Sequence, residues 1–395
     1  MLPLNGVRVL AVEQYGAGPF GTMFLADQGA EVIKIENPND GGDMSRDVGP
    51  HFFAPGDSEF FASFNRNKKS LTLDLGRPEG QAVLRDLART ADALASNLRG
   101  DVPAKLGLTY DSLKAANPKI VFAHLSAYGR SGPRAAWPGF DYLMQAEAGY
   151  FSLTGEPGTP PARFGLSVVD YMSGLGLAYA LLAALTGARA TGQGRDIDVS
   201  LFDMALSNTA YQATWYLNEG FVTERLPRSA HAVLTPCQLY RTRDGWIYIM
   251  CNKEKFWPAL CEKLGHPEWI EDARFLRFPD RLRYRDLLTD MIDWELERRT
   301  TVEWLADFAG TVPAAPVNDL EQALDNPFVT EHGRLQTIPH PSRGSYRMVA
   351  PPVNCEGEAA PARPAPALGE HTDLLLREIG YDDDRIRALR KSNVI

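Results

Sequence analysis

Residues 7–36 read VRVLAVEQYGAGPFGTMFLADQGAEVIKIE and carry the pattern of a βαβ unit. Val7–Val12 is a short apolar run of strand length, and Glu31–Glu36 is a second run rich in β-branched residues. Between them, a glycine-rich loop at Gly16–Gly21 leads into a helical pattern over Phe20–Gln28. A strand, a helix and a strand in this order predict two parallel strands joined by a crossover helix.

The same alternation continues along the chain. Short strands are predicted at Ser70–Leu75, Ala93–Ser96 and Ile120–Leu125, and a helix is predicted to begin at Pro78. Strands that alternate with helices predict a largely parallel sheet that is covered by helices on both faces.

The pattern changes after about residue 225. Asp244-Gly245 lies between two β-rich runs and is a strong signal for a hairpin turn. Charge-rich helical sequence follows from Phe256 to Gly310, and a proline-rich stretch, Pro351–Pro366, then leads to a final predicted helix at Thr372–Ile379.

These changes predict the domain organisation. We expect a large α/β domain formed by residues 1–220 and completed by residues 326–395. A smaller α+β domain, residues 225–325, is expected to be inserted between these two parts.

The composition is typical of a soluble globular protein. The chain has 395 residues and a net charge of −9, which disfavours a general surface for nucleic acid or for an anionic membrane. The four cysteines show no CxxC pattern and no paired spacing with histidines. We therefore expect neither a metal cluster nor a disulfide framework.

Two segments bear on localisation. The start, MLPLNGVRVLA, lacks a basic region followed by an apolar stretch, so no export signal is predicted. Tyr171–Ala188 holds 18 residues without a charge, close to the ~20 that span a bilayer. We interpret it as a buried core helix, because it is rich in Gly, Ala and Ser and is bounded by Asp170 and Arg189. The expected location is the cytoplasm.

Gly16, Gly18 and Gly21 form a GxGxxG pattern between a predicted strand and a predicted helix. Such a loop can present backbone N–H groups and a helix N-terminus to a phosphate. Glu36 ends the next strand, where an acid that binds a ribose would lie. The pattern leaves open an NAD-dependent oxidoreductase, a site for another phosphate-bearing nucleotide, and a purely structural turn.

Asp170 opens the long apolar helix. Ser167 and Asp170 match the Ser-x-x-Asp capping-box pattern, so this carboxylate can satisfy backbone donors at the helix start. The position also suits a nucleophile, because the helix dipole favours the ionised carboxylate while apolar neighbours remove its water. An ionised, poorly hydrated aspartate can attack an acyl carbonyl and form a covalent intermediate. The residue types leave both interpretations open.

Short motifs in a specific order and spacing run along the chain. They are AGP at 17–19, DQGA at 27–30, VIKIE at 32–36, GD at 42–43, NRNKKS at 65–70, KLGL at 105–108, YG at 128–129, GP at 132–133, VVDYMSG at 168–174, AAL at 183–185, TGQG at 191–194, PV at 316–317, GEHT at 369–372 and GYD at 380–382. Together they resemble the class III coenzyme A transferases, a family that includes formyl-CoA, carnitine and succinyl-CoA:dicarboxylate transferases. The resemblance covers nearly the whole chain.

The resemblance implies a fold and a reaction. The expected architecture is a Rossmann-like α/β large domain with a parallel sheet and a smaller inserted α+β domain, in an obligate homodimer of two interlocked chains. The expected activity is reversible CoA transfer from a short acyl-CoA, with succinyl-CoA as the guess, to a small carboxylic or dicarboxylic acid. No tightly bound cofactor is expected, because coenzyme A and acyl-CoA are substrates.

The resemblance also implies site residues. The family aspartate that matches Asp170 attacks the donor thioester, giving a mixed anhydride and then an aspartyl-CoA thioester. Gln14 and Asp141 match positions near the reacting centre, where Gln14 can donate to an oxyanion and Asp141 can equally be structural. Positions that match CoA contacts are Tyr15, Ala17, Leu73, Asn97, Leu98 and Lys105. Arg99 is added as a phosphate partner, although a solvated surface is the alternative for Arg99 and for Lys105.

The chain departs from the family pattern at two places. Residues 226–235 lack the glycine-rich loop that closes over the site in formyl-CoA transferases, which disfavours formate and oxalate as substrates. In Gly139–Asp141, Phe140 stands where the 2-methylacyl-CoA racemases of the family have a histidine, and phenylalanine cannot transfer a proton. A racemase, an NAD-dependent oxidoreductase and a non-catalytic CoA-binding protein are the alternatives. His231 is a candidate for acceptor binding, and His371 is expected to be structural.

Overall fold

The computed structural model describes residues 1–358 and 361–395. The chain forms two compact units. The first unit contains residues 1–148, 164–210 and 330–395, and the second contains residues 149–163 and 211–329. The chain therefore leaves the first unit twice and returns to it twice. The predicted smaller domain, residues 225–325, falls within the longer stretch of the second unit.

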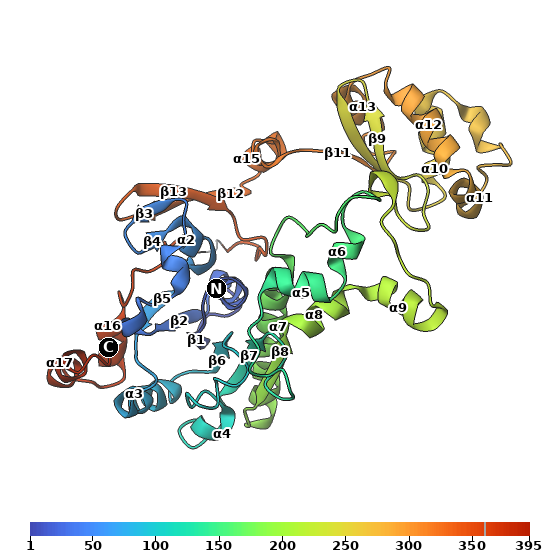
Figure 1. The fold of residues 1–395 in the computed structure, drawn as a ribbon. Helices are drawn as coiled ribbons and strands as arrows, with labels where there is room; N and C mark the ends of the chain where they lie inside the picture. Colours follow the sequence, from blue (N-terminus) through green and yellow to red (C-terminus); the bar gives the residue numbers. More distant parts are fainter. Residues whose placement is uncertain (359–360) are drawn as a thin grey trace. The chain divides into compact units, whose positions relative to one another are not determined.

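The first unit is built on a six-stranded parallel sheet in the order β5-β2-β1-β6-β7-β8 (Figure 1). Its strands are β1 (Arg8–Val12), β2 (Glu31–Glu36), β5 (Lys69–Thr72), β6 (Ala93–Ser96), β7 (Val121–Ser126) and β8 (Asp196–Ser200). Val9 of β1 lies opposite Val32 on one side and Ala93 on the other, so the predicted βαβ unit forms the centre of the sheet.

The predicted parallel sheet is confirmed, with one strand that the sequence did not indicate. Edge strand β8 reads DIDVS, and its first four residues alternate charged and apolar side chains. A continuous apolar run is the usual sign of a buried parallel strand, and β8 lacks it because it pairs only with β7.

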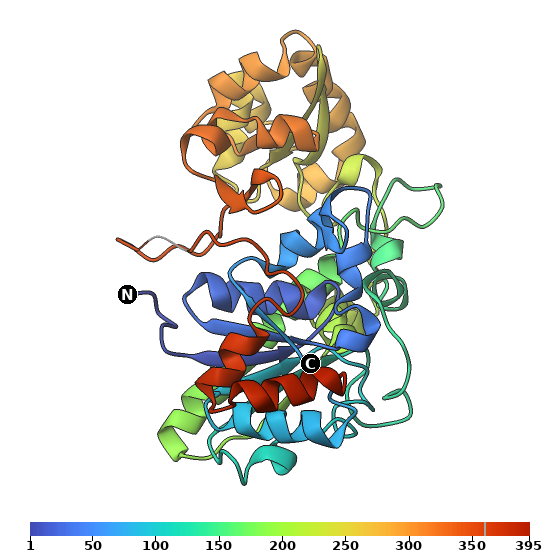
Figure 2. The same ribbon diagram turned by 90° about the vertical axis from the view of Figure 1, so that its left-hand side faces the viewer.

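Helices cover both faces of this sheet. The helices α1 (Ala17–Asp27) and α7 (Val168–Thr191) pack against each other. The helices α3 (Pro78–Ala88), α16 (Thr372–Glu378) and α17 (Asp383–Lys391) contribute to one apolar core with strands β1, β2 and β6. Figure 2 shows α3 and the two C-terminal helices together on the same side of the sheet.

The prediction that the chain ends with the helix at Thr372–Ile379 was wrong, because α17 follows it. Asp382 is the N-cap of α17, and its side chain accepts a hydrogen bond from the backbone N–H of Arg385 at 2.8 Å. Ile386 of this helix is buried in the core of the sheet. An N-cap and one buried side chain thus order a helix whose surface is mostly charged.

Further elements complete the first unit. They are η1 (Pro38–Asp40), η2 (Met44–Asp47), α2 (Glu59–Asn65), α4 (Tyr110–Leu113), α5 (Asp141–Glu147), α8 (Leu201–Asn208), the hairpin of β3 (Phe52–Ala54) with β4 (Asp57–Ser58), and the hairpin of β12 (Leu335–His340) with β13 (Gly344–Val349). The predicted extended stretch Pro351–Pro366 contains no helix among its described residues, and residues 359–360 lie outside them.

The second unit contains a three-stranded antiparallel sheet, β11-β10-β9. Its strands are β9 (Cys237–Thr242), β10 (Gly245–Met250) and β11 (Ala314–Pro316), and its larger helices are α10 (Phe256–Leu264), α11 (Phe278–Arg283), α12 (Arg285–Leu296) and α13 (Thr301–Phe308). The predicted hairpin turn at Asp244-Gly245 is confirmed, because it joins β9 to β10. Further elements of this unit are α6 (Tyr150–Leu153), α9 (Ala210–Glu219), η3 (Pro227–Ser229), η4 (Pro267–Ile270), α14 (Leu320–Leu324) and, where the chain returns, α15 (Pro327–Glu331).

Helix α7 contains the long uncharged segment. By length and composition it could cross a membrane, and half of its most apolar window is buried within the protein. Val169, Leu177 and Leu181 of this helix are almost completely buried, and α7 packs on α1 and β7. A core helix of a soluble protein also meets these criteria of length and composition. The burial of α7 therefore supports its interpretation as a core helix.

Candidate active site

A cavity of about 290 Å³ lies at the carboxyl ends of β1, β6 and β7. Its lining residues are Gln14–Ala17, Met44, Asn97–Arg99, Leu125–Ala127, Trp137–Phe140, Asp170 and Leu201. Open α/β sheets bind ligands at this edge, because loops and helix N-termini converge there. The cavity is therefore the candidate active site.

Asp170 lines this cavity from the first turn of α7. Gly16, the N-cap of α1, lies against it: a Cβ added at Gly16 would be 3.0 Å from Oδ2 of Asp170. The carboxylate therefore lies beside the N-terminal ends of two helices. The partial positive charge at these ends favours an anion.

The predicted capping box at Ser167 and Asp170 is wrong. Ser167 is the N-cap of α7, but its side chain makes no capping hydrogen bond. The backbone N–H of Asp170 donates instead to Oδ2 of Asp141, at 2.9 Å. Asp141 is buried at the start of α5, and its Oδ1 accepts a hydrogen bond from Nε2 of Gln145 at 2.5 Å. A carboxylate from another helix thus caps α7, and within the described residues no hydrogen bond to the Asp170 carboxylate is formed.

Burial and the negative charge of Asp141 raise the pKa of Asp170 to about 7. Burial removes water from the carboxyl group and disfavours its charged form, and Asp141 adds like-charge repulsion. These two effects oppose the helix dipole, which was expected to favour the ionised form, so near neutral pH both protonation states of Asp170 are populated. Its ionised form is a poorly hydrated carboxylate, which suits nucleophilic attack.

Close packing explains the GxGxxG pattern. Helix α1 begins at Ala17, three residues earlier than predicted, so Gly18 and Gly21 lie inside it. A Cβ at Gly18 would lie 2.8 Å from the side chain of Asn97, and a Cβ at Gly21 would lie 2.1 Å from the carbonyl oxygen of Gly174 in α7. Glycine is required here because α1 and α7 approach at backbone distance and the Asn97 side chain lies against the first turn of α1.

Glu36 is not free to bind a ribose, contrary to the NAD interpretation. Its buried carboxylate accepts hydrogen bonds from Nε and Nη2 of Arg46 at 2.8 and 2.7 Å, and from the hydroxyl of Ser70 at 2.6 Å. It also accepts the backbone N–H of Asp43 at 3.0 Å. These bonds occupy the carboxylate within the fold, so it cannot also hold a ribose hydroxyl.

Asn97 holds the backbone of the loop that lines the cavity. Its Oδ1 accepts the N–H of Gln14 at 2.8 Å, and its Nδ2 donates to the carbonyl oxygen of Gln14 at 2.7 Å. The side-chain amide of Asn97 thereby makes the same two hydrogen bonds to Gln14 that a residue of an adjacent β-strand would make. It orders the backbone of Gln14, a residue that borders the cavity and is exposed.

The family model described as CoA-transferase family III matches residues 4–372. The chain belongs to this family. This CoA-transferase is 34% identical to the succinate–glutarate CoA-transferase of Agrobacterium fabrum, over 95% of the chain and 96% of that protein. It is 32% identical to human succinyl-CoA:glutarate CoA-transferase, over 100% and 90% of the two chains. It is also 32% identical to a succinyl-CoA:mesaconate CoA-transferase of Haloarcula marismortui, over 96% and 97%.

Solved structures share the fold of this CoA-transferase. A CAIB/BAIF family protein from Brucella suis matches with a TM-score of 0.81 and 31% identity, over 96% of this chain and 99% of that one. Rv3272 from Mycobacterium tuberculosis matches with a TM-score of 0.83 and 32% identity, over 95% and 99%. The α/β fold and the membership of a CoA-transferase family, both predicted from the sequence, are confirmed.

Four of the predicted CoA contacts line the cavity of this CoA-transferase, namely Tyr15, Ala17, Asn97 and Leu98. Leu73 lies instead in a neighbouring cavity of about 260 Å³ at the carboxyl ends of β1, β2 and β5. Gln14 and Leu98 border both cavities. Gln14 and Leu98 therefore lie between Leu73 and the cavity that contains Asp170.

The two predicted phosphate partners, Arg99 and Lys105, share one acidic partner. Nε of Arg99 and Nζ of Lys105 each lie 2.6 Å from the carboxylate of Asp101. Hydrogen bonds from Arg99 and Lys105 lower the pKa of Asp101. Arg99 lines the cavity, whereas Lys105 is exposed and lines neither cavity, so a phosphate would compete with Asp101 for both cations.

The sequence motifs did not indicate several large apolar side chains of the cavity wall. Met44, Trp137 and Leu201 come from separate loops and helices, and only the fold brings them to Asp170. Trp137 lies two residues before the Gly139–Asp141 motif, which was the one signal for it. Phe140 also lines the wall, where its ring can pack against a substrate but cannot transfer a proton.

The two histidines have different surroundings. Nδ1 of His231, in the second unit, accepts the backbone N–H groups of Val233 and Leu234 at 3.2 Å each. Burial and the charge of Arg285 lower the pKa of His231. Nδ1 of His371 accepts the backbone N–H of Ser70 at 3.3 Å, as expected of a structural histidine.

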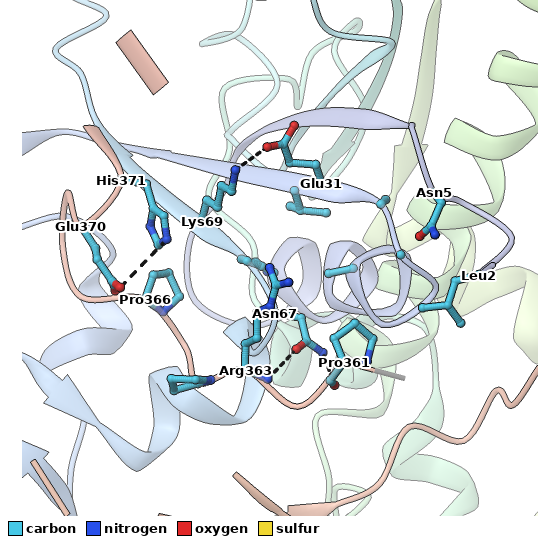
Figure 3. A pocket seen from close by; sticks show the side chains of 16 residues that line it. Leu2, Asn5, Glu31, Asn67, Lys69, Pro361, Arg363, Pro366, Glu370 and His371 are labelled. Carbon is cyan, nitrogen blue, oxygen red and sulfur yellow. Dashed lines mark hydrogen bonds and ion pairs between the residues drawn. The ribbon is translucent and has the colours of Figure 1, made fainter. Parts of the chain in front are cut away.

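A larger cavity of about 430 Å³ lies at the amino ends of β2 and β5 (Figure 3). Glu31 and Lys69 form an ion pair of 2.5 Å within it, and Glu370 lies 4.0 Å from His371. None of the predicted catalytic or CoA-binding residues lines this cavity. The cavity that contains Asp170 is therefore the better candidate for the site, although it is smaller.

Proposed function

We propose that this CoA-transferase moves coenzyme A reversibly from succinyl-CoA to a small dicarboxylic acid, with Asp170 as the nucleophile. The substrate class follows the names of its relatives, which include succinate–glutarate and succinyl-CoA:mesaconate CoA-transferases. We further propose that the working form is a cytoplasmic homodimer.

One observation carries the role of Asp170. Its carboxylate borders the cavity, and the hydrogen bond that caps α7 is supplied by Asp141 instead. In a capping box the Asp170 carboxylate would accept the backbone N–H of Ser167, and within the described residues no such bond is formed. Asp170 is thus left available for chemistry at a point where two helix N-termini favour negative charge.

The reaction proceeds through bonds to Asp170. The ionised carboxylate attacks the thioester carbonyl, the C–S bond breaks, and CoA leaves as a thiolate while a mixed anhydride forms. The thiolate then attacks the aspartyl carbonyl, and succinate leaves as a carboxylate. The acceptor carboxylate attacks the resulting aspartyl-CoA thioester, and the two steps run in reverse. Acyl activation is conserved at each step, so neither ATP nor water is consumed.

Gln14 and Asp141 support these steps. The side-chain amide of Gln14, beside the cavity, donates to the oxyanion that forms as the thioester carbonyl is attacked. Asp141 orients the first turn of α7 through its bond to the Asp170 backbone and, together with burial, keeps the pKa of Asp170 near 7. Tyr15, Ala17, Leu73, Asn97, Leu98, Arg99 and Lys105 are proposed to contact CoA.

Trapping of the aspartyl thioester tests the mechanism. The enzyme is incubated with succinyl-CoA and hydroxylamine, and Asp170 is expected to become a hydroxamate that peptide mass spectrometry detects. Asp170→Asn serves as the control, because it keeps the size of the side chain and should lose both labelling and CoA exchange. Retained exchange in Asp170→Asn, or labelling at another residue, would contradict the proposal.

A panel of acids then defines the acceptor. Succinyl-CoA is mixed with glutarate, mesaconate, oxalate and formate in separate reactions, and new acyl-CoA products are read by mass spectrometry. Dicarboxylates longer than oxalate are expected to react, and formate is expected not to. Efficient transfer to formate would contradict the proposed substrate class.

A further inference from the structure

A buried group of charges lies directly beneath the loop that borders Asp170. Nζ of Lys34 forms an ion pair with Oδ2 of Asp43 at 2.8 Å and donates to the carbonyl oxygen of Glu13 at 2.9 Å. Nζ of Lys68 lies 2.8 Å from Oε1 of Glu13. The side chains of Lys34, Asp43, Glu13 and Lys68 are at most 3% exposed. Such an arrangement is costly to desolvate and contributes little net stability.

The group reaches the active-site loop through Asp43. Oδ1 of Asp43 accepts the backbone N–H of Tyr15 at 3.0 Å. Burial opposes ionisation, but the charge of Lys34 and hydrogen bonds from Lys34 and Tyr15 outweigh it and lower the pKa of Asp43. Tyr15 has φ +67°, a left-handed conformation that is costly for a residue with a side chain. An ionised acceptor therefore holds this peptide in a conformation that it would not adopt alone.

The strained peptide lies next to the reacting carboxylate. Gly16 follows Tyr15 directly and contacts Asp170, and Asn97 holds Gln14 on the other side. Asp43 also precedes Met44, which lines the same cavity. Asp43 is therefore linked to two parts of the cavity lining: to Tyr15 by a hydrogen bond, and to Met44 as its neighbour in the chain.

We propose that Asp43 is a positioning residue for CoA transfer, which with Lys34 fixes the Gln14–Gly16 backbone against Asp170. Asp43 lines the neighbouring cavity that contains Leu73, but not the cavity that contains Asp170, so its effect on Asp170 is transmitted through the loop. Its removal should shift the loop relative to Asp170 and slow the chemical steps more than it weakens binding of acyl-CoA. A displacement of about 1 Å can cost on the order of a hundredfold in rate.

Asp43→Asn tests this role against a matched control. The new amide would direct an N–H group toward the ammonium of Lys34, or lose the bond to Tyr15, at nearly unchanged size. The control is Asp27→Asn, since Asp27 is also buried, pairs with Arg66 at 2.7 Å, and lies at the opposite end of α1. For Asp43→Asn we expect kcat with succinyl-CoA and glutarate to fall about tenfold or more, with KM for succinyl-CoA changed less than about threefold. Asp27→Asn should change kcat by less than about twofold at temperatures where circular dichroism shows it folded.

Lys34→Gln and the double variant complete the experiment. If Lys34 and Asp43 act as one unit, the double variant should be no slower than the slower single variant. An unchanged kcat in Asp43→Asn, or an equal loss in Asp27→Asn, overturns the proposal. If Asp43→Asn does not fold, an unchanged kcat in soluble Lys34→Gln overturns it as well. The readout is CoA transfer itself, so failure of this proposal is distinguishable from failure of the Asp170 mechanism, which hydroxylamine labelling tests separately.

Discussion

At the scale of single residues, the surroundings of Asp170 act in opposite directions on its charge. The N-termini of α1 and α7 favour the carboxylate, whereas burial and Asp141 raise its pKa to about 7. A nucleophile must be ionised to attack, and a weakly hydrated carboxylate attacks more readily than a fully hydrated one. A pKa near the working pH serves both requirements.

The pH dependence of CoA transfer should report this pKa. Below pH 7 the neutral form of Asp170 predominates, so kcat/KM is expected to rise with pH and to reach half its maximum near pH 7. Asp141→Asn removes the nearby negative charge and should move this midpoint to lower pH, although burial will keep it above the value of an exposed aspartate. The measurement is kcat/KM for succinyl-CoA across pH 5 to 9.

Glu147→Gln provides the control for this shift. Glu147 is an exposed acid on the same helix, α5, and its partners are Tyr128 and Arg134. Its removal changes the net charge equally but should leave the midpoint in place. An Asp141→Asn profile that coincides with the wild-type profile would show that Asp141 does not tune Asp170.

At the scale of elements, the crossing of α1 and α7 sets the position of the site. Both helices begin at the cavity, and their backbones meet at Gly21 and Gly174. A Cβ at Gly174 would lie 2.4 Å from the carbonyl oxygen of Ala17, in the first turn of α1. The separation of the two helices is therefore coupled to the distance between Gly16 and Asp170.

Gly21→Ala should push these helices apart, because its Cβ would lie 2.1 Å from the carbonyl oxygen of Gly174. We expect a loss of about 1–3 kcal/mol in the free energy of unfolding, measured with urea, and a lower kcat. Gly187→Ala is the control on α7, since a Cβ at that position meets nothing within 4 Å. It should raise the free energy of unfolding by about 0.5–1 kcal/mol, because alanine favours helix more than glycine does. Equal effects of the two substitutions would refute the packing argument.

At the scale of the whole molecule, large apolar side chains are exposed on several segments, and one of these segments contains α9. In α9 and the residues after it, Tyr216, Leu217 and Val222 are 59%, 77% and 62% exposed. Contiguous exposed apolar groups of this kind usually mark a protein interface. They support the proposal of a homodimer.

Light scattering after size exclusion tests the homodimer. The particle mass is expected to be twice that of one chain at all concentrations that retain activity, because the proposed homodimer is an obligate one. Leu217→Glu should weaken the dimer by burying a charge at the interface. A fully active monomer would refute the proposal.

The sequence by itself determined the broad architecture and the family. Apolar runs of strand length alternating with helical patterns predicted the parallel sheet. Both patterns can be recognised from residues close together in the chain, without knowledge of the tertiary structure. The motif around Asp170, with the other motifs in order, identified the CoA-transferase family. These properties depend on residues close together in the chain or on the order of short segments.

Only the tertiary structure decided what the individual side chains do. The sequence could not show that Asp141 rather than Ser167 caps α7, or that Glu36 is occupied by Arg46, because these partners meet only after folding. The pKa of Asp170 likewise depends on burial and on a neighbour 29 positions away. The local sequence pattern specifies helices and strands. Burial and hydrogen bonding depend on residues that are distant in sequence, so their effects on a side chain are determined only by the folded structure.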